Sequence, residues 1–281
     1  MLEELSRHAC FGGQQCFYRH DSEVIGLPMR FSVFHPPVES HDMVPVLFYL
    51  AGLTCTEETF MMKGGAQQWA AQNGLMLVAP DTSPRNTGIE GATESWDFGE
   101  GAGFYLDALQ PPWNRHFRME SYITRELLAI VVAEFNVQAE RVGIFGHSMG
   151  GHGALALAFR HPDLFRSVSA LAPISSAMNV PWGQKAFSRY LGADPALWAQ
   201  YDACELIRAK GAVFGHGILV DQGTSDQFLS EQLQPERLEA ACAAAGQPLA
   251  LRRREGYDHG YYFIQSFMRD HIAFHKDALS A

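Results

Sequence analysis

The stretch GIFGHSMGGHGAL, residues 143 to 155, holds Ser148 between two glycines directly after an apolar run. A G-x-S-x-G pattern at a strand-to-helix turn exposes the serine hydroxyl above a sheet, and glycines leave room for that tight, strained turn. The helix behind the serine directs free N–H groups toward it. The short pattern occurs often by chance, but the preceding strand, the following helix and the two further glycines favour a nucleophilic Ser148 over a structural hydroxyl.

A serine nucleophile needs a base, and the base needs an orienting acid. Where G-x-S-x-G occurs in this setting, the order along the chain is serine, acid, histidine. His259, in EGYDHGYYF, directly follows the last expected strand and is the predicted base. Among the other histidines, His147 is expected to point away from the nucleophile. His271 and His275, four apart on the last expected helix, are expected to be surface residues rather than a metal-binding pair.

Two acids in ILVDQGTSDQF compete for the third position. Asp226 lies in the loop beyond the strand, where the fold places the acid, and is preferred to Asp221, whose direction is fixed by the strand's pleat. Asp258 adjoins His259 and is poorly placed to reach the far nitrogen of its ring. The expected mechanism is proton transfer from Ser148 to His259, formation of an acyl-enzyme, and its release by water that His259 activates.

Acyl transfer also needs two backbone N–H donors for the developing oxyanion. Met149, the residue after the proposed nucleophile, is predicted to supply one. The loop AGLTCTEE, residues 51–58, is predicted to supply the other, and the pattern alone does not decide which of its residues does so.

Short apolar segments alternate with helical ones after two N-terminal strands, 14–21 and 28–37. This alternation predicts a mostly parallel sheet with helices on both faces, which suits an α/β-hydrolase fold in a single domain, residues 1–281. Further strands are expected at 44–52, 75–80, 141–146, 165–173, 215–223 and 248–256, and helices at 58–74, 119–135, 150–162, 235–246 and 267–279. Two long excursions, 84–118 and 173–200, interrupt the alternation. The first is expected to be a packed, functional loop because it contains Trp96, Phe98, Phe104 and Tyr105.

Composition excludes several classes of protein. A formal charge of −10 without a basic run argues against nucleic-acid binding. The charged N-terminus lacks a secretory signal, and the longest apolar run, about ten residues, is too short for a membrane helix. Five scattered cysteines without a CxxC indicate neither a disulfide framework nor a zinc site. We therefore expect a cytoplasmic protein that requires no metal and no cofactor.

Eight stretches resemble the S-formylglutathione hydrolase (esterase D) family: LAGLTCTEETF, APDTSPR, WDFGEGAGFYLDA, RMESYITREL, GIFGHSMGGHGAL, PWGQKAF, DQGTSDQFL and GYDHGYYFI. They run from about residue 50 to residue 265 in the family's order. The resemblance implies a cytosolic enzyme that hydrolyses a small glutathione thioester to glutathione and formate, and it allows a homodimer. It implies Ser148, Asp226 and His259 as the triad. It also implies that Leu53 and Met149 donate the oxyanion hydrogen bonds.

The substrate pocket is less sharply defined by the sequence. Cys55, in the GLTCT motif, is expected either as a small buried apolar residue or as a thiol that lines the acyl pocket. Trp182, in PWGQKAF, packs either on the leaving group or only on its own loop. Local cations should receive the glutathione carboxylates. Lys185, Lys63 and Arg85 are the candidates, and an ordinary solvated role is the alternative for each.

Three alternative functions share some of these sequence features. A general short-chain carboxylesterase shares the machinery and differs in its leaving group. An acyltransferase of this fold would replace water by a hydroxyl acceptor. A non-catalytic binding protein on the same fold would carry a damaged triad, whereas Ser148, Asp226 and His259 are all present.

Overall fold

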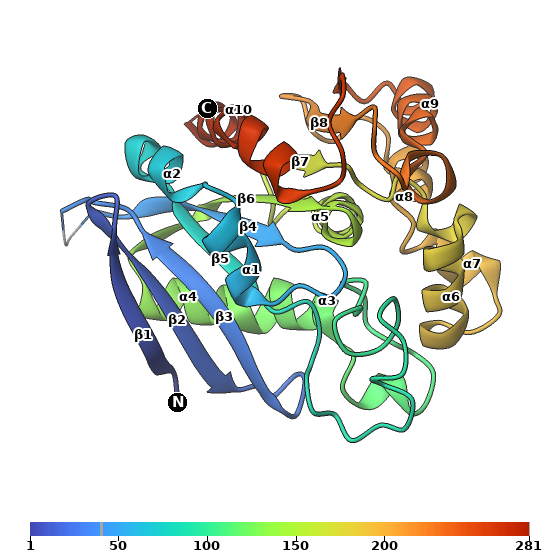
Figure 1. Ribbon diagram of the computed structural model, residues 1–281, viewed down its shortest axis with the longest axis horizontal. Coiled ribbons are helices and arrows are strands. Elements are labelled where there is room, and N and C mark those ends of the chain that lie inside the picture. The colour runs from blue at the N-terminus through green and yellow to red at the C-terminus, as the bar shows by residue number, and fades with distance from the viewer. Residues whose placement is uncertain (40–41, 281) are drawn as a thin grey trace.

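The computed structural model describes residues 1–39 and 42–280. Its framework is a nine-stranded sheet in the order β1-β2-β3-β5-β4-β6-β7-β8-β9 (Figure 1). The strands are β1 (Glu3–Cys10), β2 (Gly13–Asp21), β3 (Pro28–His35), β4 (Val44–Leu50), β5 (Met76–Pro80), β6 (Val137–His147), β7 (Ser167–Leu171), β8 (Ile218–Gly223) and β9 (Leu249–Arg254). The pairs β1–β2, β2–β3 and β3–β5 are antiparallel and the others are parallel. The mostly parallel sheet with antiparallel N-terminal strands is confirmed.

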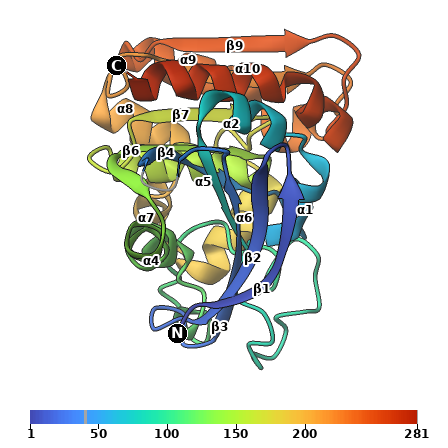
Figure 2. The same cartoon turned by 90° about the vertical axis from the view of Figure 1, so that its left-hand side faces the viewer.

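Helices cover both faces of this sheet. Figure 2 shows α10 (Tyr261–Ser280) on one side of β6 and β7, and α4 (Leu128–Glu134) and α5 (Met149–Arg160) on the other. The remaining helices are α1 (Glu57–Lys63), α2 (Gln67–Asn73), α3 (Met119–Ser121), α6 (Pro181–Tyr190), α7 (Pro195–Ala199), α8 (Ala203–Lys210) and α9 (Pro235–Ala245). A π-helical segment, Tyr122–Leu127, joins α3 to α4 within the expected helix.

Two expectations about elements were wrong. The first strand, β1, was missed because none of its eight residues is buried and the segment shows no alternation of apolar and polar residues. The single helix expected over 58–74 is two helices, α1 and α2. A Cβ at Gly64 would lie 2.5 Å from the Phe60 ring, and Gly65 has a φ of +64°. The chain turns at these two glycines because a left-handed residue cannot continue a helix.

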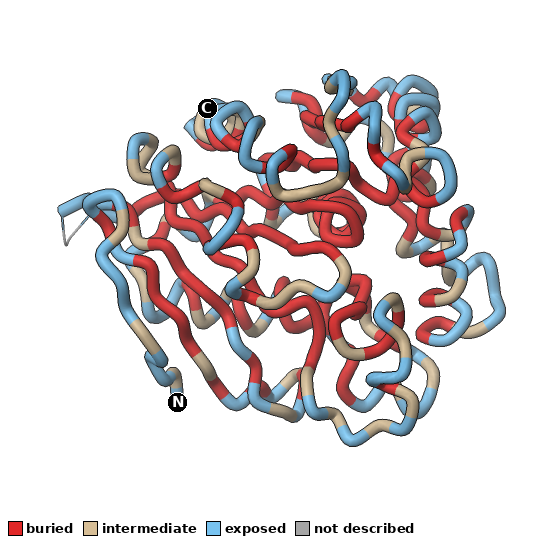
Figure 3. Tube along the Cα trace, in the orientation of Figure 1, coloured by how far each residue is buried: buried red, intermediate tan, exposed pale blue. Residues whose placement is uncertain are grey.

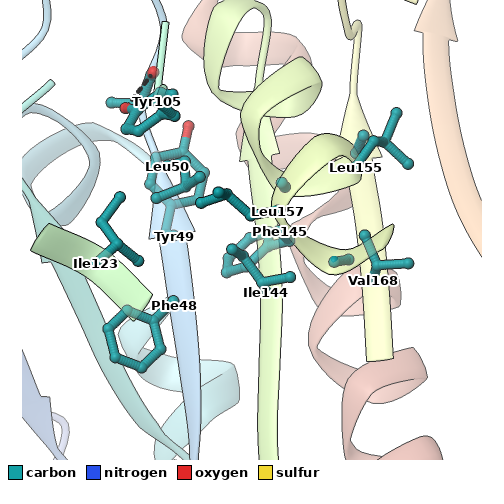
Figure 4. Packing of buried hydrophobic residues seen from close by; sticks show 14 of the residues in the cluster. Phe48, Tyr49, Leu50, Tyr105, Ile123, Ile144, Phe145, Leu155, Leu157 and Val168 are labelled. Atoms are coloured by element: carbon teal, nitrogen blue, oxygen red, sulfur yellow. Dashed lines mark hydrogen bonds between the residues drawn. The ribbon is translucent and has the colours of Figure 1, made fainter. Parts of the chain in front are cut away.

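The core lies between the sheet and its helices, along the central strands (Figure 3). Tyr49 on β4 and Phe145 on β6 are fully buried, and their rings meet edge to face with centroids 4.9 Å apart. Figure 4 shows Leu155 and Leu157 of α5 packed near this region. This rigid centre fixes the strand ends at which side chains of functional interest lie.

The carboxyl ends of the parallel strands are aligned. Leu50 of β4 pairs with Gly146 of β6, and His147 pairs with Leu171 of β7. Loops that leave these strands therefore meet at one edge of the sheet, where open α/β sheets bind ligands.

The two histidines of α10 are buried, which corrects the expectation that they lie on the surface. His271 and His275 are both fully inaccessible. His271 contacts Asp221 through Nε2 at 3.0 Å, and both histidines hydrogen-bond to Ser169 Oγ, at 2.7 and 2.9 Å. Ser167 Oγ lies 2.6 Å from Nδ1 of His275. His271 and His275 lie on the buried face of α10, together with Ile264, Met268 and Ile272, whose spacing is that of one helix face.

This network predicts that the free energy of unfolding falls as the pH drops below about 6.5. Burial lowers the pKa of His271 and of His275 below the ordinary value near 6.5. Their stabilising effect is complete above 6.5 and decreases toward lower pH, because the unfolded chain then binds more protons than the native one. Each histidine contributes a slope of up to about 1.4 kcal/mol per pH unit.

Urea unfolding of the wild type and of His275→Gln between pH 5 and 8 measures this dependence. The variant should lose less stability on acidification than the wild type. The variant His8→Gln, at an exposed position on β1, is the control and should retain the wild-type slope. Equal slopes in His275→Gln and the wild type would contradict the prediction.

Candidate active site

Ser148 occupies a strained turn between β6 and α5. Its backbone has φ 58° and ψ −119°, a conformation that non-glycine residues adopt only where the surrounding structure enforces it. The chain on either side is tightly packed: a Cβ at Gly150 would lie 2.0 Å from the Leu50 carbonyl oxygen, and one at Gly146 would lie 2.2 Å from that of Gly150. The glycines of the motif are therefore required by close backbone contact.

Replacing Gly150 by alanine should prevent this turn from forming. The new methyl group would overlap backbone atoms of β4, which cannot move without disturbing the sheet. We expect Gly150→Ala to lower the melting temperature by more than about 10 °C, or to yield insoluble protein. Gly215→Ala is the matched control, because a Cβ at Gly215 meets nothing within 4 Å. A Gly150→Ala protein as stable as Gly215→Ala would contradict this account.

The structure brings His259 and Asp226 together. Nδ1 of His259 lies 2.5 Å from Oδ2 of Asp226. The other carboxylate oxygen accepts a hydrogen bond from the Phe228 backbone N–H at 2.8 Å. The loops that carry the two residues are joined, because Ser225 N donates to the Tyr257 carbonyl at 3.0 Å. The imidazole is thus held with Nδ1 toward the acid and Nε2 on the opposite side of the ring.

The two alternative acids have other partners. Asp221 is fully buried and accepts hydrogen bonds from Arg252 Nε at 2.9 Å and Arg254 Nε at 2.6 Å, besides its contact with His271. Its partners hold the pKa of Asp221 at about 2, although burial by itself acts in the opposite direction. Asp258 accepts a hydrogen bond from Gly260 N at 2.9 Å.

The loop after β4 lies directly against the serine. A Cβ at Gly52 would lie 3.2 Å from the Cβ of Ser148. The N–H groups of Leu53 and Met149 have no hydrogen-bond partner within residues 1–39 and 42–280. By contrast, the neighbouring N–H of Thr54 donates to the Gly101 carbonyl at 2.9 Å. Leu53 follows Gly52, whose contact with Ser148 brings the loop after β4 against the serine. Met149 follows Ser148 directly in the chain as the first residue of α5. Both free N–H donors therefore lie next to Ser148.

His147 lies against His259, which corrects the expectation that it points away from the site. The two ring centroids are 4.4 Å apart, and Nε2 of His147 is buried with no hydrogen-bond partner among the described side chains and backbone. Burial and, secondarily, the neighbouring His259 lower the pKa of His147 well below its ordinary value. A neutral imidazole therefore packs beside the predicted base.

A row of aromatic rings extends from His259 to the surface. Phe228 packs against His259 at 5.1 Å between centroids, Trp182 against Phe228 at 4.8 Å, and Trp96 against Trp182 at 5.4 Å. Trp182 is 8% exposed and Trp96 is 56% exposed. Phe228 was missed as a site residue, although it lies two residues after Asp226 in a quoted motif. Of the four aromatic residues expected to pack within the excursion 84–118, Phe98, Phe104 and Tyr105 are buried and Trp96 is exposed.

Lys185 and Cys55, the other candidates for the substrate pocket, both contact neighbouring side chains. Lys185 Nζ contacts Asp97 Oδ1 at 2.5 Å and Ser95 Oγ at 2.7 Å, so its charge is balanced. Cys55 is partly buried, with Sγ 3.9 Å from the Tyr261 hydroxyl, and burial raises the pKa of its thiol.

The other two cations also have neighbours. Lys63 lies over the Tyr261 ring, with Nζ 5.8 Å from the centroid. Arg85 pairs with Asp81 at 2.7 Å and donates to the Cys55 carbonyl at 2.8 Å. Arg85 thus holds the loop that contains Leu53. Neither cation is placed in direct contact with the triad candidates.

Two searches bear on metals and membranes. No group of three or more His, Cys, Asp or Glu side chains that could hold a metal ion occurs in residues 1–39 and 42–280. Over the same described ranges, none of the helices is long and apolar enough to cross a membrane.

Comparisons with known proteins identify the family and the fold. The family model Esterase, described as "Putative esterase", matches residues 22–274. An S-formylglutathione hydrolase of Paracoccus denitrificans (strain Pd 1222) is 50% identical over 277 residues, which are 99% of this chain and 98% of that protein. The solved S-formylglutathione hydrolase from Agrobacterium tumefaciens is 44% identical and superposes with a TM-score of 0.95, covering 98% of this chain and 99% of that one.

A more distant structure, an S-formylglutathione hydrolase from Staphylococcus aureus, is 16% identical with a TM-score of 0.66 over 98% of this chain and 99% of that one, and it shares the fold. Fold and family model together define an α/β-hydrolase esterase. At 50% identity over nearly its full length, the chain belongs to the S-formylglutathione hydrolase family, as the sequence motifs predicted.

Proposed function

We propose that this chain hydrolyses S-formylglutathione to glutathione and formate, with Ser148 as nucleophile, His259 as base and Asp226 as the orienting acid. The observation that carries the proposal is the 2.5 Å contact between His259 Nδ1 and Asp226, in a chain whose strained turn presents Ser148. The names of the two relatives at 50% and 44% identity support the choice of substrate.

The steps follow from the residues. Asp226 keeps the proton on Nδ1 of His259, so Nε2 is free to accept the Ser148 proton as Oγ attacks the formyl carbon. The carbonyl oxygen gains negative charge and accepts hydrogen bonds from the N–H groups of Leu53 and Met149. The C–S bond then breaks, and His259 gives its proton to the departing thiolate. Water, deprotonated by His259, releases formate and restores the serine.

The aromatic row supplies the proposed contact for the leaving group. Trp182 and Phe228 lie between His259 and the exposed Trp96, so a peptide thiol that leaves the serine would pass along their rings. Cys55 and Lys185 complete the proposed substrate pocket, Cys55 on the acyl side and Lys185 near the outer end of the row, with its charge shared with Asp97.

Steady-state kinetics with S-formylglutathione and 4-nitrophenyl acetate tests the substrate. We expect kcat/KM to be at least about 100-fold higher for the thioester, since leaving-group contacts add to transition-state binding. Comparable or better activity on the oxygen ester would make the chain a general short-chain carboxylesterase. Formyl transfer to added alcohols in preference to hydrolysis would instead indicate an acyltransferase.

We further propose that the enzyme acts in the cytoplasm, and the family resemblance allows a homodimer. The acidic composition and the reduced state expected of five unpaired cysteines favour the first statement. Light scattering tests the second, because a monomer would have a mass of 31.2 kDa.

A further inference from the structure

A cavity of about 620 Å³ opens beside the start of α1, between β3 and the loop after β5. Neither Ser148, Asp226 nor His259 lines it. Its charged lining, equal in positive and negative side chains, consists of Arg19, Arg30, Arg85, Glu57, Glu58 and Asp81. We call it the Arg30–Glu57 cavity.

Glu57 is the unusual member of this lining. Its side chain is 4% exposed, and its carboxylate accepts a hydrogen bond from the backbone N–H of Glu57 itself but from no other residue among 1–39 and 42–280. The nearest cation is Arg30, with Nη1 3.9 Å from Oε1, which is too long for a hydrogen bond. Burial, and secondarily the charge of Asp81, raise the pKa of Glu57 to about 7. The carboxylate therefore has one backbone donor and one distant cation, and a ligand ammonium would give it a direct, charge-assisted partner.

The other charged side chains of the cavity differ in whether they already have a close partner of opposite charge within the chain. Asp81 accepts hydrogen bonds from Arg85 Nη2 at 2.7 Å and from the Thr82 N–H at 2.6 Å, so Asp81 and Arg85 satisfy each other. Arg30 is the available cation, because its side chain is 54% exposed and its pairing with Glu57 is long. Arg19 is 43% exposed and lies 3.5 Å from Glu3.

We propose that the Arg30–Glu57 cavity binds an α-amino-acid group, with the ligand's ammonium on Glu57 and its carboxylate on Arg30. The acidic side chains of the lining would repel a simple anion, and the arginines would repel a simple cation. A ligand with an ammonium and a carboxylate on one carbon is complementary to both kinds of side chain. Such a group can bridge Glu57 and Arg30 after a small outward rotation of the half-exposed arginine, and it replaces one long ion pair by two charge-assisted hydrogen bonds.

The size of the cavity and its position extend the proposal. About 620 Å³ is within the range of small-molecule sites and leaves room for a short peptide beyond the amino-acid group. Glutathione ends in a γ-glutamyl group that carries this ammonium and carboxylate, so a second glutathione, separate from the one that leaves along the aromatic row, is the occupant that follows if the proposed function holds; this choice of peptide rests on that function. Free glutamate offers the same chemistry.

The cavity shares a wall with the loop that carries Leu53. Thr56 lines the cavity and its hydroxyl caps α1. Arg85, also in the lining, donates to the Cys55 carbonyl at 2.8 Å, and Thr82 Oγ1 donates to the same oxygen at 2.7 Å. A ligand that binds Arg30 and Glu57 therefore also stabilises the loop after β4, which contains Leu53 and lies next to Ser148.

Calorimetric titration tests the proposal in two preparations, the unmodified enzyme with free glutamate and enzyme blocked at Ser148 by a fluorophosphonate with glutathione. We expect both ligands to bind, and N-acetylglutathione, which lacks the ammonium, to bind at least about tenfold more weakly. Arg30→Gln and Glu57→Gln should each weaken binding at least tenfold. Arg253→Gln, an exposed arginine paired with Glu239 outside the cavity, is the control and should bind normally.

Arg30→Gln keeps the test informative even if Glu57→Gln folds poorly, because Arg30 is exposed. Absence of binding by both ligands, or equal binding by Arg30→Gln and the wild type, would overturn the proposal. Binding of glutamate alone would support the amino-acid site and assign it to the free amino acid. Binding through Arg30 in an enzyme that fails to hydrolyse S-formylglutathione would support the cavity and reject the proposed function.

Discussion

Ser148→Ala should lose at least about 10⁴-fold in kcat/KM for S-formylglutathione while it keeps the wild-type fold. The substitution removes only the attacking oxygen from a turn whose backbone is fixed by β4, β6 and α5. The donors of Leu53 and Met149 and the His259–Asp226 pair remain, so a residual rate above that in water is expected. Hydrolysis followed at saturating and limiting substrate, together with circular dichroism of the folded protein, measures the effect.

Ser175→Ala is the matched control for this variant. Ser175 is also a buried serine near the carboxyl ends of the strands, and its hydroxyl has no hydrogen-bond partner among the described residues. Its removal should change kcat/KM less than about twofold, since no interaction is lost. If Ser148→Ala were as active as Ser175→Ala, another nucleophile would have to be sought.

Features with local causes could be predicted from the sequence. The alternation of apolar strands with helices predicts the parallel sheet because each strand must be buried on both faces. The glycines around Ser148 indicate the turn because the backbone contacts that require them are a property of the turn itself. The position of Asp226 in the loop beyond β8, rather than at the strand's end, places it beside His259, as its 2.5 Å contact shows.

Features that depend on packing between distant segments could not be predicted in this way. The contact of His147 with His259 joins β6 to the loop before α10, and nothing in either segment signals it. The contact of Trp96 with Trp182 joins the two long excursions. The burial of His271, which was expected on the surface, also depends on distant packing, because a buried histidine needs partners and Ser169 lies about one hundred residues away.

Asp226→Asn is expected to reduce kcat/KM by about 10⁴-fold with little change in stability. The Oδ1 position accepts a hydrogen bond from the Phe228 N–H and would hold the amide oxygen there, so the NH₂ group would face Nδ1 of His259. An amide that donates to Nδ1 forces the ring proton onto Nε2, and His259 can then no longer accept the proton of Ser148. The loss should fall mainly in kcat, measured under saturating substrate.

Asp221→Asn separates this effect from a general need for a buried carboxylate. Asp221 lies five residues earlier, is fully buried, and holds Arg252, Arg254 and His271. Loss of its charge weakens the hydrogen bonds from Arg252 and Arg254, which keep Asp270 as their other acidic partner, so we expect a loss of about 1–3 kcal/mol in unfolding free energy and a near-normal kcat. If the two variants lost activity equally, the contact between Asp226 and His259 would be structural, and the tautomer argument would fail. If Asp221→Asn instead lost mainly stability and Asp226→Asn lost mainly activity, Asp221 would be a stabilising residue. Asp226 would then be the residue that fixes the position of the proton on His259.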